Sequence, residues 1–317
     1  MSILTSNRSW LFLALSVLIL GVFLGGCAPK SKTKSGKLNV VCTTGMVGDL
    51  AKSIGGDHIT VTTLMGPGID PHLYRASAGT VKVLSNADVI FYNGLHLEAK
   101  MGEIFEKLNQ RITTVAVTRD IPETLLRSPK EFKGFHDPHV WFDVSMWAMT
   151  VNVVRDTLIE KDPAHKADYL KRAADYRSTL LKLHAEVSAS VAILPQSQRI
   201  LITAHDAFGY FGQAYGFDVM GLQGISTESE AGAKDVQRLA QIIADRKVNA
   251  LFVESSVPKR NIEAVQAAVK SRNWDTKIGG QLFSDAMGNP GTPEGTYIGM
   301  VRFNVKTIVT ALQGSPQ

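Results

Sequence analysis

The tripeptide Asp-Pro-His occurs twice in this 317-residue chain, at residues 70–72 and 137–139. Proline fixes its own φ angle and pushes the preceding residue into an extended conformation, so each histidine is expected on a stiff turn rather than inside a helix. A stiff turn suits a metal ligand because it holds the imidazole in one direction. Either copy alone could be an ordinary polar turn. Two copies, together with a third histidine and an aspartate, favour a metal site.

The third histidine and the aspartate lie where strand-like runs end. His205 follows the apolar run 200–203, and Asp285 closely follows a second such run. His72 and His139 belong to the first half of the chain, whereas the other two belong to the second half. Open α/β sheets place ligand groups at strand ends, so we expect the four to meet in a cleft between two domains.

The elements that must position these residues read as α/β architecture with parallel sheets, because short apolar runs alternate with helical patterns. The pattern appears twice, which predicts one α/β lobe over residues 38–160 and another over residues 196–317. Expected strands lie at 38–41, 59–64, 87–92, 199–203, 217–222, 250–253 and 277–282. Expected helices lie near 46–54, 207–215, 230–246 and 258–272, followed by a final helix that reaches the C-terminus.

The longest periodic stretch, residues 161–195, joins the two halves and predicts one interdomain helix. Asp162 is expected as its N-cap, Pro163 as its first residue and Pro195 as its stop. About 30 residues at about 1.5 Å each would extend some 45 Å, enough to run along both domains. A coiled-coil arm is the alternative, but the stretch lacks sustained charge pairing beside its apolar seam. We therefore expect a rigid backbone that limits hinge motion.

The N-terminal segment is set apart from the folded lobes. Residues 10–26 are almost all apolar and end in Leu-Gly-Gly before Cys27, which resembles a lipoprotein signal peptide with its lipobox. Roughly 17 apolar residues could also just span a bilayer, but the small residues before the cysteine favour cleavage. We expect residues 1–26 to be removed and Cys27 to carry lipid. Residues 27–37 then form a lysine-rich tether to the extracytoplasmic face of a bacterial membrane.

Composition fits a globular protein, with 44% hydrophobic and 20% charged residues. The net charge of +5 arises largely from the tether lysines. An anionic membrane surface is therefore a simpler partner than nucleic acid. Once Cys27 is lipidated, Cys42 is the only thiol left, so no disulfide can form within the chain. Cys42 lies in an apolar run and is expected to be a buried structural thiol.

Five motifs carry a family resemblance, and they occur in the same order as in that family. They are MGPGIDPHLY (65–74), YNGLHLE (92–98), DPHVWFD (137–143), TAHDAFGYF (203–211) and LFSDAMG (282–288). Together they resemble the TroA-like metal-specific solute-binding lipoproteins of ABC transporters, from about residue 38 to the C-terminus. The resemblance implies two α/β lobes joined by one long helix, an ABC permease as partner and a monomer. It places the metal ligands at His72, His139, His205 and Asp285.

Three neutral imidazoles and one carboxylate suit Zn²⁺ in tetrahedral geometry, and they accept Mn²⁺ if the carboxylate binds through both oxygens. The set does not suit Ca²⁺ or Mg²⁺. In the resemblance, manganese carriers often have Glu at the position of His205, and many zinc carriers have a long His-rich loop before the second ligand. This chain has neither, because its stretch 118–136 is short and holds one histidine. Zinc is favoured, and manganese or iron remains open.

Other side chains near the motifs are assigned supporting roles. Asp206 and Glu254 are candidates to accept a hydrogen bond from a ligating histidine. His96 and His136 are expected at structural or rim positions rather than as ligands. Four aromatic residues could shield the site from water or simply belong to the core: Trp141, Phe142, Phe208 and Phe211.

The main rival reading is a zinc hydrolase. Catalytic zinc needs an open position for water and a nearby base, whereas four protein ligands already complete a tetrahedron. No His-Glu-x-x-His helix or nucleophile elbow occurs in the sequence. A surface adhesin is a further alternative, but it is supported by no repeat and is expected as a secondary role at most. We therefore expect a binding protein and not an enzyme.

Overall fold

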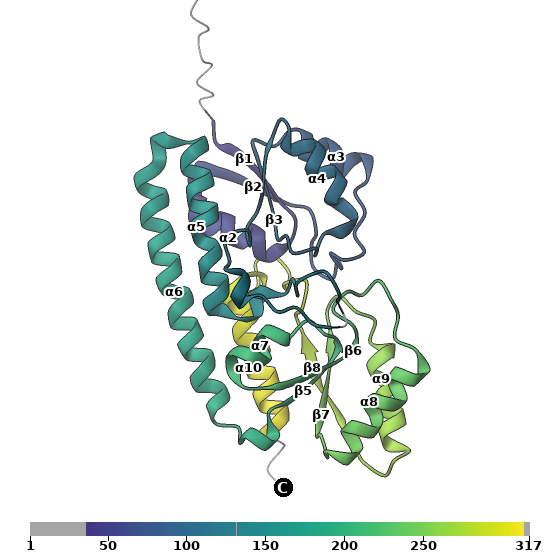
Figure 1. The fold of residues 1–317 in the computed structure, drawn as a ribbon. Helices are drawn as coiled ribbons and strands as arrows, with labels where there is room; N and C mark the ends of the chain where they lie inside the picture. The colour runs from purple at the N-terminus through teal and green to yellow at the C-terminus, as the bar shows by residue number, and fades with distance from the viewer. Residues whose placement is uncertain (1–35, 131, 314–317) are drawn as a thin grey trace, which may run out of the picture. The chain divides into compact units, whose positions relative to one another are not determined.

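The first lobe is organised around four parallel strands in the order β2-β1-β3-β4 (Figure 1). The strands are β1 (Leu38–Cys42), β2 (Ile59–Thr63), β3 (Val89–Tyr92) and β4 (Thr113–Ala116). Val40 of the central strand β1 pairs with Val61 on one side and with Val89 on the other. Because β1 and β3 are nearly continuous apolar runs, both faces of the sheet centre can be buried, as is usual for parallel sheets.

The computed structural model describes residues 36–130 and 132–313. The expected signal peptide (1–26), Cys27 and nearly all of the tether lie outside these residues. Residues 37–317 group into one unit that contains both α/β lobes and the helices between them.

Four helices accompany the first sheet. They are α2 (Gly45–Gly55), α3 (Ala78–Ser85), α4 (Gly102–Asn109) and α5 (Val144–Lys161). The hydroxyl of Thr44 accepts a hydrogen bond from Val47 N and so caps α2, and Ser77 caps α3 in the same way through Thr80 N. Helix α2 buries a face made of residues 46, 47, 50, 51 and 54, which is the spacing of an amphipathic helix.

The second lobe contains two pairs of parallel strands, β5 with β6 and β7 with β8. Strand β5 also lies beside β7. The strands are β5 (Ile200–His205), β6 (Asp218–Gln223), β7 (Ala250–Glu254) and β8 (Lys277–Leu282). The helices are α7 (Gly209–Tyr215), α8 (Ala233–Asp245), α9 (Arg260–Lys270) and α10 (Tyr297–Gln313). The α/β class with parallel sheets is confirmed, although β4 was not anticipated because its sequence, Thr-Thr-Val-Ala, contains only one large apolar residue.

The predicted long helix is confirmed as α6 (Lys166–Ala192), with a difference at its start. Residues 163–165 form a 3₁₀ turn, and the α-helix begins after it. The Asp162 side chain does not cap the backbone of α6, so that part of the prediction is wrong. Its carboxylate instead accepts hydrogen bonds from His165 Nδ1 at 2.6 Å and Tyr169 Oη at 2.7 Å.

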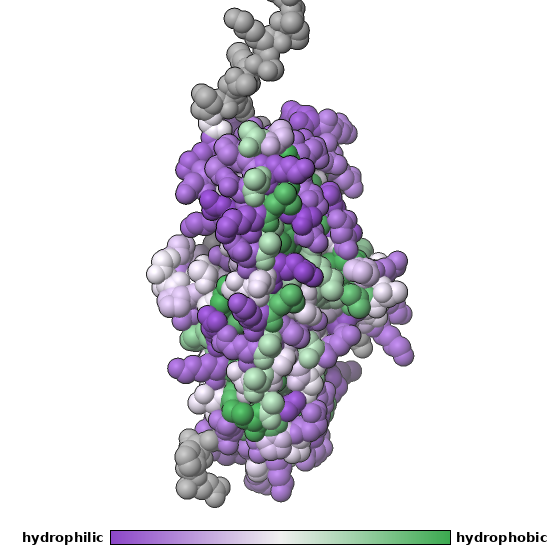
Figure 2. All heavy atoms as spheres, turned by 90° about the vertical axis from the view of Figure 1, so that its left-hand side faces the viewer, coloured by the Kyte–Doolittle hydropathy of each residue, from purple (hydrophilic) through white to green (hydrophobic). Residues whose placement is uncertain are grey.

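Helix α6 joins the two lobes by packing on both. It contacts α2 and α5 of the first lobe and α7 and α10 of the second. Tyr176 Oη donates to Asp49 on α2, and Arg302 on α10 pairs with Glu186 near the far end of α6. The buried face is the apolar seam expected from the sequence: Tyr169, Ala173, Tyr176, Leu180, Leu183, Val187 and Val191. The opposite face is mainly hydrophilic with a narrow hydrophobic line along it (Figure 2).

Leu180 and Leu181 provide a matched test of this packing, because Leu180 is fully buried whereas Leu181 is 41% exposed. Leu180→Ala removes buried methyl groups and should lower the free energy of unfolding by about 2–5 kcal/mol. Leu181→Ala should change it by no more than about 0.5 kcal/mol. Urea unfolding of both variants measures the difference. Equal losses would contradict the orientation of α6.

Candidate metal centre

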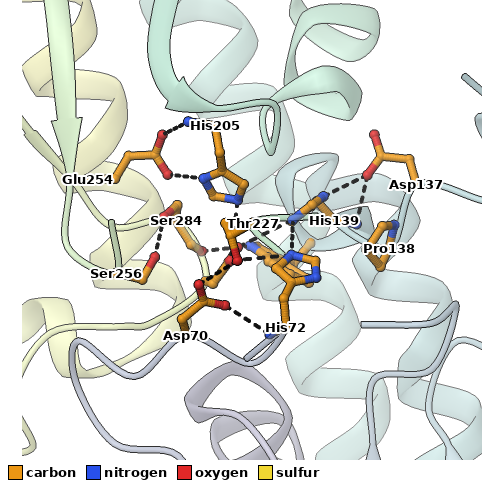
Figure 3. Close-up of polar contacts among 12 residues, drawn as sticks. Asp70, His72, Asp137, Pro138, His139, His205, Thr227, Glu254, Ser256 and Ser284 are labelled. Carbon is orange, nitrogen blue, oxygen red and sulfur yellow. Dashed lines mark hydrogen bonds and ion pairs between the residues drawn. The ribbon is translucent and has the colours of Figure 1, made fainter. Parts of the chain in front are cut away.

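Four side chains from separate parts of the chain meet between the lobes: His72, His139, His205 and Asp285 (Figure 3). His72 lies in the loop after β2, and His139 precedes a 3₁₀ turn at residues 140–142. His205 is the last residue of β5, and Asp285 follows β8. All four are buried, with at most 2% of each residue exposed.

The spacing of their polar atoms fits a metal shell. The Nε2 atoms of His72 and His139 lie 3.3 Å apart, and His205 Nε2 lies 3.3 Å from Asp285 Oδ2. His139 Nε2 lies 3.4 Å from Asp285 Oδ1, and all four ligand atoms are within 4.8 Å of one another. Bonds of 2.0–2.1 Å in a tetrahedron separate neighbouring ligand atoms by about 3.3 Å. The shorter contacts therefore match the edges of a tetrahedral zinc shell.

Each Asp-Pro-His copy forms the same turn. Asp70 Oδ1 accepts a hydrogen bond from the backbone N–H of His72 at 2.9 Å, and Asp137 Oδ1 does so from His139 at 3.0 Å. This is an Asx-turn, which local sequence favours because the aspartate side chain reaches the backbone two residues ahead. The repeated tripeptide thus builds two rigid supports for imidazoles.

Two carboxylates set the orientation of two of the rings. Asp137 Oδ1 also accepts from His139 Nδ1 at 2.8 Å. Glu254 Oε2 lies 2.5 Å from His205 Nδ1, while Glu254 Oε1 accepts from the His205 backbone N–H at 2.8 Å. In the neutral form of each ring, a proton on Nδ1 faces the carboxylate and leaves the Nε2 lone pair directed at the centre of the cluster.

The protonation of the cluster follows from burial and from its own charges. Burial disfavours a charged imidazole and lowers the pKa of His72 to about 3. Burial acts in the same direction on His139, but hydrogen bonds with Asp137 and Asp285 outweigh it and raise its pKa to about 9. His139 therefore holds a proton at neutral pH when no metal is bound. A divalent ion must displace that proton, so affinity should fall as the pH falls.

The pKa of the Asp285 carboxyl is held well below its ordinary value. Burial alone would raise it, but the charge of His205 and the hydrogen bond with His139 outweigh that effect. Among the described residues, the side chains that face the Asp285 oxygens are the three histidines of the cluster, whose Nε2 atoms lie 3.3–3.6 Å away. A buried carboxylate is costly unless protonated imidazoles or a metal cation balance its charge. This is the chemistry expected of a metal ligand.

The carboxylates near the cluster differ in whether they contact one of its histidines. Glu254 contacts His205 through both of its carboxylate oxygens. Asp206 is half-buried and makes no side-chain hydrogen bond or ion pair with a ligand among the described contacts. Asp137 fills the role for His139 that the sequence analysis did not assign, although its place two residues before His139 could have indicated it.

The aromatic residues divide into two groups. The Trp141 ring lies 5.2 Å from the His139 ring, and Trp141 Nε1 donates to the carbonyl of Ser284, so Trp141 does wall the cluster. The other three lie in the aromatic core, where Phe142 and Phe208 stack at 4.1 Å and Phe211 contacts Tyr215 and Phe217. His96 and His136 lie outside the cluster, where His96 stacks on Phe135 and His136 bonds Ser128.

A family model described as zinc-uptake complex component A, periplasmic, matches residues 40–311. The chain belongs to this family. It is 50% identical over 299 residues to the zinc-binding protein TroA of Treponema pallidum, covering 93% of this chain and 96% of that relative. It is 45% identical over 300 residues to the manganese-binding lipoprotein MntA of Bacillus subtilis, covering 94% and 98%.

Solved structures of this family superimpose closely on the chain. The periplasmic zinc-binding protein TroA from Treponema pallidum aligns with a TM-score of 0.86 at 52% identity, covering 87% of this chain and 99% of that one. The Fe(III)-bound YtgA from Chlamydia trachomatis aligns with a TM-score of 0.79 at 25% identity, covering 88% and 99%. The family fold is therefore used for more than one transition metal.

Replacing Glu254 by glutamine tests its hold on His205. The amide keeps the shape of the side chain but removes the negative charge beside Nδ1, so Glu254→Gln should weaken zinc binding about 10- to 100-fold. Competition with a chromophoric chelator measures this. Glu263→Gln, at an exposed position in the first turn of α9, is the control and should bind as the wild type does. An unchanged affinity in Glu254→Gln would contradict the assignment.

Proposed function

We propose that this protein captures one divalent transition-metal ion between its lobes and delivers it to the membrane permease of an ABC transporter. The observation that carries the proposal is the buried cluster of three imidazole nitrogens and one carboxylate at tetrahedral spacing. The family to which the chain belongs supports the same role.

In this proposal the metal ligands are His72, His139, His205 and Asp285. Zn²⁺ is the expected cargo because three nitrogens and one oxygen at these distances suit a four-coordinate ion. Mn²⁺ is next, since Asp285 has both oxygens directed into the cluster and could bind through both. Fe²⁺ is the third possibility. The different metals named for relatives at 50% and 45% identity are consistent with this order of candidates.

The same geometry argues for a receptor rather than a hydrolase. A catalytic zinc keeps one position for water, and a base must be free to take its proton. Here four side chains fill the shell, and the nearest carboxylates are engaged: Asp137 with His139 and Glu254 with His205. Neither of these two carboxylates is therefore free to act as a general base.

We infer that the mature protein is a monomer tethered to the extracytoplasmic face of the membrane through lipid on Cys27. The lobes are assigned to residues 38–160 and 196–317, the linking helix to 161–195 and the tether to 27–37. Within the described ranges no helix is both long and apolar enough to cross a membrane. Several relatives are named lipoproteins, in agreement with such an anchor.

Ligand substitutions test the cluster directly. The wild type should bind one Zn²⁺ per chain, and His72→Ala or His139→Ala should weaken binding by at least about 100-fold, because each removes a quarter of the shell. Isothermal titration gives both the stoichiometry and the affinity. His136→Ala, close to His139 in sequence but bonded to Ser128, is the control. Two tight sites, or normal affinity in both variants, would refute the assignment.

The two cysteines offer a matched test of the anchor. Cys27→Ser should abolish lipidation, so the protein should no longer partition with membranes or detergent. Cys42 is fully buried on β1, and burial raises the pKa of its thiol, so Cys42→Ser should lower stability without affecting partitioning. Detergent phase separation of both variants measures the difference. Normal partitioning of Cys27→Ser would contradict the lipid anchor.

A further inference from the structure

One loop of the second lobe reaches across to the first lobe beside the metal centre. It runs from the end of β6 to the start of α8, over residues 224–232. Thr227 Oγ1 donates to Asp70 Oδ2 at 2.6 Å, and Glu228 pairs with Lys100 at 2.6 Å. Two neighbouring residues of one loop therefore hold two separate segments of the first lobe.

Asp70 connects this loop to the histidine turn. One of its oxygens accepts from the His72 backbone N–H, and the other accepts from Thr227. Figure 3 shows Asp70 and Thr227 joined beside the cluster of four candidate ligands. Thr227 is only 6% exposed and Asp70 is half-buried, so the hydrogen bond is partly shielded from water. The orientation of the His72 turn thus depends on a contact with the opposite lobe.

The opposite side of the interface is joined much more extensively. Helix α6 packs along both lobes. Trp141 Nε1 donates to the Ser284 carbonyl, and Tyr297 Oη donates to the Trp141 carbonyl at 2.7 Å, all in the buried interior. A wide hinge opening would break these contacts together. Among the described residues, the loop 224–232 is joined to the first lobe by the two polar contacts named above, so its local movement breaks far fewer interlobe contacts and releases Asp70 from the second lobe.

We propose that Thr227 is an interlobe catch that retains the metal by holding Asp70 and, through it, the His72 turn. This inference rests on the proposed function. Thr227 acts as a positioning residue, since its hydroxyl contacts Asp70 and not a ligand. Metal leaves when the loop lifts and the Thr227 to Asp70 hydrogen bond breaks. The His72 turn is then free to withdraw its imidazole.

Thr227 carries this role rather than the adjacent ion pair. Lys100 and Glu228 have side chains that are 31% and 41% exposed, and such pairs contribute little in water. The hydrogen bond from Thr227 to the Asp70 carboxylate is partly buried and therefore stronger, and its loss leaves a half-buried carboxylate oxygen without this donor. Removing the Thr227 hydroxyl is therefore expected to accelerate metal release more than removing the Lys100–Glu228 ion pair.

The test compares Thr227→Val with Thr227→Ser in zinc-loaded protein. Valine has nearly the shape of threonine but has no hydroxyl, whereas serine keeps it. Stopped-flow transfer of Zn²⁺ to excess EDTA should show dissociation about tenfold faster for Thr227→Val, as the loss of a hydrogen bond to a charged group implies. Thr227→Ser should stay within about threefold of the wild type. Lys100→Met should accelerate release less than about threefold, because its pair is exposed.

Matched controls separate retention from stability. Thr60→Val replaces an exposed threonine on β2 and should leave the dissociation rate unchanged. The association rate of Thr227→Val should match the wild type, since the catch closes only after the ion has arrived. Thermal unfolding should place Thr227→Val and Thr227→Ser at similar melting temperatures, so a rate difference between them reports the hydroxyl.

Three results would overturn the inference: an unchanged dissociation rate in Thr227→Val, an equal acceleration in Thr227→Ser, or an equal rise in the association rate. Failure of the wild type to bind zinc at all would instead refute the proposed function. The two failures are therefore distinguishable in the same experiment.

Discussion

The rest of this structure depends on one constraint: electron-rich nitrogen and oxygen atoms are held close together in a buried site. Three imidazole nitrogens and a carboxylate converge at separations of 3.3–3.6 Å, and none of these side chains is more than 2% exposed. Lone pairs held so close repel one another unless a proton or a cation lies between them. Such an arrangement persists only if the surrounding structure fixes each ring independently.

Each lobe holds its histidines in place in a different way. In the first lobe, Asx-turns built from Asp-Pro-His position the backbones of His72 and His139. In the second, β5 ends at His205, and Glu254 at the end of the adjacent β7 accepts a hydrogen bond from the His205 backbone N–H and lies 2.5 Å from its ring Nδ1. The parallel strands bring these groups to one edge because their carboxyl ends point the same way. His205 therefore rests on a strand, whereas Asx-turns hold His72 and His139 within longer loops.

Helix α6 then decides how the lobes can move. Because it packs on α2 and α5 as well as on α7 and α10, the lobes are joined along its length. Wide opening around a flexible hinge would separate Trp141 from Ser284 and Tyr297 from Trp141. We therefore expect capture and release of an ion to involve small movements near the cluster and not a wide opening of the lobes. The hydrogen bond between Asp70 and Thr227 is the interlobe contact that such a small movement would break.

Many features of this fold follow from short stretches of the sequence. The α/β alternation, the seam of α6 and the turn at each Asp-Pro-His copy follow from periodicity and from the local geometry of proline and aspartate, so all were readable without a structure. Strand β4 was not predicted because its sequence, Thr-Thr-Val-Ala, is not an apolar run, unlike the equally short β3. The family motifs pointed to four ligand positions, but they did not reveal which atoms face one another.

Only the tertiary structure decided the partners of those ligands. Asp206 was one of two carboxylates expected to accept a hydrogen bond from a ligating histidine, yet it lies at a bend just after β5 and makes no side-chain contact with the cluster among the described contacts. Glu254 performs that role from 49 residues away, and Thr227 reaches Asp70 across 157 residues. Sequence determines the local turns and faces, because those depend on near neighbours. The pairing of charges across the lobes is decided by packing, because it depends on how whole sheets and helices meet.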